Sequence, residues 1–303
     1  MTQTVISPST TAPRTPSPAG RPRRGSRRVT SRGRLHWALV PFAWLLVTAD
    51  VLVIVWMILS SLKSTREMAL SPWSWPTKFL WSNYTDAWVA GEFGTGVLNS
   101  VVLIVGSGVG CILLCAPAAY ALSRTTSRLA GAHTIFFVIG LGIPAQTIFI
   151  PLYVVFDRAG LVDSIGGLML IYIGTGVPYA LFLLTAFFRS LPGELEEAAA
   201  IDGAGPWYTF WRIMFPLARS GLITIFILQA IGHWGETFFA LVMLRHRTTL
   251  SLSLYNFAIN MQYNGNKFNV LFAGLIILIL PLLVIYVLLG RRIIEGIAAG
   301  YSK

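Results

Sequence analysis

The chain has few charged residues and few of the residue types that ligate metals. Only 12% of its 303 residues are charged, and Asp and Glu together number 12. A soluble globular domain carries about 25% charged residues, so the composition excludes that class. The two cysteines, Cys111 and Cys115, lie four residues apart in an apolar run, where they are neighbours on one helical face rather than disulfide partners. The four histidines lack the spacing of metal ligands, and we expect no metal site.

The sequence also lacks the motifs of a catalyst. It contains no G-x-x-x-x-G-K-[ST] phosphate-binding loop. We find no nucleophile and base at helical spacing, which an intramembrane enzyme would need. We therefore expect no catalytic residue, no cofactor and no ATP site in this chain.

Apolar residues are abundant, at 55% of the sequence with a mean hydropathy of +0.68. A helix needs about 20 apolar residues to cross a hydrocarbon core of roughly 30 Å. Six segments meet this requirement and predict an all-α polytopic protein, with six transmembrane helices, in the cell (plasma or inner) membrane. The predicted spans are residues 37–60, 97–122, 134–156, 166–187, 218–242 and 269–290.

Basic residues concentrate in the N-terminal segment 1–34, which holds eight of the 23 Lys and Arg residues. This segment is rich in Ser, Thr, Pro and Arg and has little apolar surface to bury, so we predict that it is disordered. The net charge of +11 thus reflects a tail beside an anionic bilayer and not a nucleic-acid-binding face. The positive-inside rule then places both termini, the C-terminal segment 291–303 and the loop 188–217 in the cytoplasm.

Between the first two spans lies a polar segment, residues 63–96, with four tryptophans. Tryptophan suits the membrane interface, where its ring and its N–H group are both satisfied. We expect residues 35–96 to form the first transmembrane helix and an external Trp-rich segment.

The loop 188–217 carries its own helical signals. Three glutamates follow Pro192, and negative charge is favourable near a helix N-terminus. Three alanines then favour helix, Gly203 permits a left-handed turn, and Gly205-Pro206 precedes a second short helix. The pattern predicts a helix-turn-helix elbow along the membrane face.

The spacing within this loop is specific. Glu197-Ala198-Ala199 is followed by Gly203 four residues after the second alanine, and then by Ile213 and Pro216. It resembles the EAA loop of the membrane subunits of ATP-binding-cassette (ABC) importers, and departs from it at Phe215, where that family usually has Leu. The stretches that resemble the sugar-importing, maltose-type branch are residues 141–153, 187–192 and 296–303.

The resemblance implies a type I importer permease fold, with a permease core at residues 97–290. It also implies that the elbow contacts an ATPase and transmits its closure to the spans. The residues assigned to this coupling contact are Glu197, Ala198, Ala199, Asp202, Gly203, Arg212 and Pro216. For Asp202 and Arg212, solvated charges or bonds within the elbow are equally open. The implied partners are a second permease (a heterodimer), two ATPase subunits or domains that hold ATP and Mg, and an extracytoplasmic solute-binding protein.

Polar residues inside spans normally face a bundle interior or a water-filled path. Gln229, His233 and Glu236 fall on one face of the fifth predicted helix. With Trp234 beside them they form a candidate lining for a sugar path. Contacts to a partner permease or to the external interface stay open for the same residues. Gln146 and Tyr179 are further candidates for this path.

The resulting hypothesis is a transport subunit that moves a sugar or oligosaccharide by alternating access, without covalent chemistry. The alternative is an ion-coupled secondary transporter, which would need membrane-embedded carboxylates and an internal repeat. Asp50 and Glu236 are the obvious acidic residues within spans, and we find no repeat.

Overall fold

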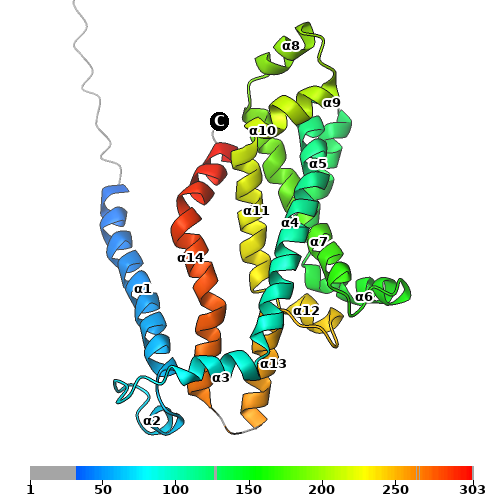
Figure 1. The fold of residues 1–303 in the computed structure, drawn as a ribbon. Coiled ribbons are helices and arrows are strands. Elements are labelled where there is room, and N and C mark those ends of the chain that lie inside the picture. Colours follow the sequence, from blue (N-terminus) through cyan, green and yellow to red (C-terminus); the bar gives the residue numbers. More distant parts are fainter. Residues whose placement is uncertain (1–31, 126–127, 264, 266, 302–303) are drawn as a thin grey trace, which may run out of the picture. The chain divides into compact units, whose positions relative to one another are not determined.

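The computed structural model describes residues 32–125, 128–263, 265 and 267–301, and all regular structure in these ranges is helical (Figure 1). Four helices are each long and apolar enough to cross a membrane. They are α1 (Arg32–Ser61), α4 (Phe93–Arg124), α7 (Ile165–Ser190) and α14 (Phe268–Tyr301). Helix α1 begins inside the predicted tail 1–34, of which residues 1–31 lie outside the described residues. Helix α14 continues through most of the segment 291–303.

The other two predicted spans are bent. The third consists of α5 (Arg128–Leu141), the short 3₁₀ helix η1 (Ala145–Ile148) and α6 (Phe149–Arg158), with an angle of 86° at the break. Pro144 precedes η1 and disfavours helical backbone at the residue before it, which accounts for the break. The span predicted at 134–156 thus consists of two helices with a sharp break between them, not of one continuous helix.

The fifth predicted span, 218–242, is also interrupted. Helix α11 (Arg219–Trp234) ends at Gly235, and the chain continues into a separate short helix, α12 (Phe238–Met243). At its other end α11 meets the preceding helical segment, Pro206–Leu217, at 69°. The chain thus has up to six spans if each bent pair counts as one.

Helices α4, α7 and α11 pack together at the centre of the bundle. At Gly106 an added Cβ would lie 2.3 Å from Met169 of α7, and at Gly108 one would lie 2.7 Å from Phe226 of α11. Small residues let helix backbones approach closely, which drives helix association inside a membrane. The two cysteines of α4 are free and buried in this core, with their Sγ atoms 3.7 Å apart.

At one end of the bundle lie α2 (Thr65–Leu70), α3 (Ser82–Ala90) and α13 (Leu250–Tyr263), opposite the end that carries α8 (Figure 1). Helix α13 lies between the fifth and sixth predicted spans, where no helix was predicted. Asn83 of α3 donates to the carbonyl oxygens of Ser61 and Lys63 at 2.7 and 2.9 Å, and accepts from Asn269 of α14 at 3.1 Å. These bonds fix the Trp-rich segment to the start of α14. Trp73, Trp75 and Trp81 remain exposed on this segment.

Candidate functional site

The predicted elbow is present at the opposite end of the bundle, and its first arm is α8 (Glu194–Ile201). As the sequence predicted, Gly203 adopts a left-handed conformation, with φ of 80°. Its N–H donates to Ala200 O at 3.1 Å, and Ala204 N–H donates to Ala199 O at 2.9 Å. These two bonds form a Schellman motif, which satisfies the last carbonyl groups of a helix. The four-residue spacing from Ala199 to the glycine is the spacing that this motif requires.

The second arm consists of α9 (Pro206–Thr209), the π-helix η2 (Phe210–Met214) and α10 (Phe215–Leu217). Helix α9 begins at Pro206, as expected. Phe210 and Met214 are buried in the same core cluster as Phe188 of α7. Phe215, the departure from the family pattern, packs its ring 5.0 Å from that of Trp211. The second arm is thereby packed onto the central helices through aromatic contacts.

An ion pair holds the first arm. Arg124, at the end of α4, donates from Nε to Glu196 Oε1 at 2.7 Å and from Nη2 to Leu191 O at 3.2 Å. The two charged side chains are 24% and 21% exposed. The sequence did not reveal this pair, because its members are 72 residues apart and neither belongs to the recognised motif. The elbow is thus attached to the central helices at both arms.

The outer surface of the elbow is apolar and open. Ile201 is 87% exposed and Trp207 is 67% exposed, and Tyr208 is exposed as well. Asp202 and Arg212 are exposed, and neither side chain forms a hydrogen bond or ion pair within the described part of the chain. Exposed large apolar groups beside unpaired charges are typical of a surface that binds another protein.

The remaining residues assigned to the coupling contact differ in exposure. Glu197, Ala198 and Pro216 are exposed, whereas Ala199 is only 5% exposed. Ala199 therefore supports the turn through its carbonyl group and offers almost no side-chain surface in this structure. Ala198 is the better-exposed alanine of the motif.

The polar residues of the fifth span lie at the junction of α7, α11 and α12. Glu236 lies beyond the end of α11, so the prediction that it shares a helical face with Gln229 is wrong. Its carboxylate accepts from Tyr172 Oη at 2.8 Å and from Phe239 N–H at 2.8 Å. The His233 ring stacks on that of Tyr172, with centroids 4.3 Å apart. Glu236 therefore joins α7 to the start of α12.

Gln229 is buried between α11, α4 and α7, at 6% exposure. Its Nε2 lies 3.0 Å from Cys111 Sγ, whereas its Oε1 has no hydrogen-bond partner among the described residues. His233 Nε2, one turn further along α11, is likewise buried without a partner there. Such unsatisfied groups are rare and require an explanation.

The other candidates for the path are placed separately. Trp234 donates from Nε1 to Leu278 O of α14 at 2.9 Å, so it connects two helices. Gln146 is exposed in η1, and Tyr179 is partly exposed in α7. The structure does not bring Gln146 together with Gln229.

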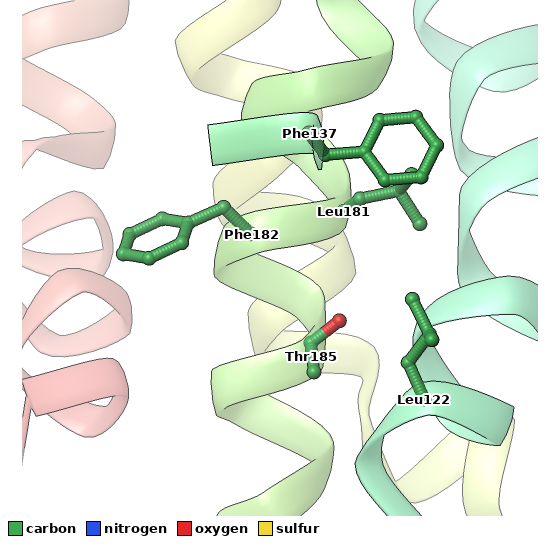
Figure 2. Close-up of a pocket in the computed structure, with 5 residues that line it drawn as sticks. All are labelled: Leu122, Phe137, Leu181, Phe182 and Thr185. Atoms are coloured by element: carbon green, nitrogen blue, oxygen red, sulfur yellow. The ribbon is translucent and has the colours of Figure 1, made fainter. Parts of the chain in front are cut away.

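Near the elbow, the contact of α5 with α4 and α7 leaves almost no free space. A cavity of about 10 Å³ lies between Leu122, Phe137, Leu181 and Thr185. Figure 2 shows the Phe182 ring extending away from this cluster. The cavity is too small for a ligand. A wider apolar groove of about 540 Å³ lies between α5, η1, α6 and α7.

Together, these helices and their structured elbow define a multi-pass membrane protein with a cluster of polar side chains in its core. Residues 108–297 match the family of binding-protein-dependent transport system inner membrane components. The chain is 34% identical over 263 residues to a diacetylchitobiose uptake system permease protein of Streptomyces coelicolor, which covers 84% of this chain and 86% of that protein. It is 30% identical to a trehalose transport system permease protein of Mycobacterium tuberculosis, over 92% of this chain and 99% of that protein.

A solved structure has a similar fold. It is a bacterial ABC transporter involved in the import of the acidic polysaccharide alginate, with a TM-score of 0.70 and 24% identity over 86% of this chain and 98% of that chain. The chain belongs to the family of binding-protein-dependent transport system inner membrane components, among sugar ABC transporter permeases. The predicted resemblance and the location in the cell membrane are confirmed.

Proposed function

We propose that this chain is a transmembrane subunit of an ATP-driven importer, which translocates a sugar or oligosaccharide delivered by an extracytoplasmic binding protein. A second permease and two ATPase subunits or domains complete the transporter. Both termini and the elbow lie in the cytoplasm. Closure of the ATPase moves the elbow, and this movement exposes the sugar path to the two sides of the membrane in turn.

The observation that carries this proposal is the construction of the elbow. Its outer surface exposes Ile201, Trp207 and Tyr208, while Arg124 and the buried Phe210 fix it to α4 and α7. Because the elbow is attached to α4 and α7 in this way, it can transmit the movement of a docked protein to the membrane-spanning helices. The ion-coupled alternative is not favoured, because the family is that of ABC permeases and because the Glu236 carboxylate is engaged by three hydrogen bonds.

Reconstitution in liposomes with the partner subunits tests the proposal. We expect uptake of at least one disaccharide from a panel of trehalose, diacetylchitobiose and melibiose, dependent on ATP and on the binding protein.

In the same complex, Ala198→Cys should crosslink to the ATPase, while the buried Ala199→Cys should react poorly. Uptake driven by an ion gradient without ATP, or crosslinking at neither position, would contradict the proposal.

The path for the sugar is proposed to pass the unsatisfied atoms of Gln229 and His233. We expect Gln229→Leu to leave complex recovery unchanged and to raise the sugar concentration for half-maximal uptake. One lost hydrogen bond to a neutral group is worth roughly 0.5–1.5 kcal/mol, or about 2- to 13-fold. Uptake and complex recovery are measured on the same preparation. Unchanged uptake would remove Gln229 from the path, and loss of the complex would instead indicate a contact with the partner permease.

A further inference from the structure

A polar hollow of about 270 Å³ lies at the end of the bundle away from the elbow. Its walls are the α3–α4 turn at residues 90–92, the segment 245–248 and one side of α13 (Figure 1). The base includes Phe257, which is buried. The hollow is separate from the elbow and contains none of the residues assigned to the path.

Two basic side chains of the rim are already engaged by this chain. The Arg245 guanidinium donates to the hydroxyl of Tyr153, and His246 Nδ1 lies 2.8 Å from Asp163 Oδ2. The other Asp163 oxygen accepts from the backbone N–H groups of residues 245, 246 and 247. These N–H groups and the imidazole hold the pKa of Asp163 well below its usual range. The segment 245–247 is thus fixed by its backbone, which makes the rim a preformed wall.

Thr248 and Ser253 of the hollow are hydrogen-bonded to each other, whereas four other polar side chains are uncommitted. Glu92, Arg247, Asn256 and Asn260 are exposed, and their side chains form no hydrogen bond or ion pair with any other described residue. They comprise one anion, one cation and two amides. Such a set is balanced in charge and supplies both donors and acceptors.

We propose that this hollow binds one ring of a neutral saccharide at the outer end of the transporter. Neighbouring hydroxyl groups of a sugar both donate and accept, and so match amide, carboxylate and guanidinium groups that face one space. A volume slightly below the roughly 300–1,000 Å³ of drug-sized pockets suits a single ring. The identity of the ligand as the transported sugar rests on the proposed function.

The carboxylate of Glu92 disfavours an anionic ligand on its side of the hollow. A phosphate or carboxylate group would approach the free carboxylate of Glu92, while Arg245 and His246 are occupied within the chain. Arg247, and Arg245 whose partner is a neutral hydroxyl, would offset part of that repulsion. A neutral ligand meets no such penalty.

The test uses the complete complex in lipid nanodiscs without the binding protein and without ATP. Saturation-transfer NMR is recorded with the three disaccharides used for uptake. We expect wild type to bind at least one of them, and Asn256→Leu and Asn260→Leu each to weaken binding about 2- to 13-fold. Gln262→Leu removes an exposed amide from the same helix outside the hollow and should bind as wild type does.

Two kinds of result would overturn the inference. The first is absence of saccharide binding by wild type, or wild-type binding by both Asn variants. The second is measured after the binding protein is added to the same nanodiscs: loss of its capture by the Asn variants without any saccharide signal would make the hollow a protein-docking surface. Both readouts are independent of import. A complex that binds sugar but does not import it would therefore contradict the proposed function and leave this inference standing.

Discussion

Gly203→Val is expected to insert and assemble normally while losing most of the ATPase stimulation by the loaded binding protein. An added Cβ at Gly203 would meet nothing within 4 Å, so the clash expected for a bulky side chain is absent. The cost arises from the backbone, because φ of 80° is unfavourable for a β-branched residue. Strain of this kind costs about 1–3 kcal/mol, which shifts the population of the native elbow about 5- to 150-fold.

Gly205→Val provides a matched control for this substitution. Gly205 lies two residues further along, has φ of −72° and ψ of 159°, and also has open space at its Cβ position. Valine adopts that conformation freely, so this variant should couple as wild type does. Stimulated ATPase activity and complex recovery are measured for both. Equal stimulation in the two variants would show that the left-handed turn is not needed for coupling.

The second large effect is expected at the ion pair that holds α8. Arg124→Gln should lower stimulated ATPase activity and uptake together, since it leaves Glu196 without its cationic partner and removes the guanidinium donor to the carbonyl of Leu191. Exposed pairs contribute about 0.2–1 kcal/mol and loss of a buried partner costs about 3–5 kcal/mol. With side chains about a quarter exposed, this pair should fall between these ranges, at about 1–3 kcal/mol.

A charge reversal distinguishes loss of the Arg124–Glu196 ion pair from a general effect of losing a positive charge. The double variant Arg124→Glu/Glu196→Arg should recover part of the activity that either single reversal loses. Arg189→Gln removes an exposed arginine whose side chain forms no hydrogen bond or ion pair with other described residues. This variant should have little effect. If Arg189→Gln impairs coupling as strongly as Arg124→Gln, the specific role of the ion pair is refuted.

The local features of the elbow could be read from the sequence because they depend on neighbouring residues. The glutamates at the start of α8, the left-handed Gly203 and the start of α9 at Pro206 follow from capping, backbone sterics and proline geometry. The length of the apolar runs likewise predicted an all-helical membrane protein. These properties need no information about distant parts of the chain.

Breaks and contacts between helices could not be obtained in this way. Hydropathy does not show that the third span bends at Pro144 or that the fifth ends at Gly235. The apolar pattern also gave no prediction of α13. It placed Glu236 within a helix, whereas α11 ends at Trp234. Mean hydropathy averages over a window, whereas a break depends on which neighbour satisfies the freed backbone groups.

The sequence by itself determined the class of the chain, its approximate spans and the turn that shapes the elbow, because each rests on local composition and backbone preference. Only the tertiary structure decided which groups of the elbow are exposed, that Arg124 reaches Glu196, and that Gln229 is buried with an oxygen that has no partner among the described residues. These outcomes depend on side chains distant in sequence that meet when α4, α7 and α11 pack, and no local pattern encodes those pairings.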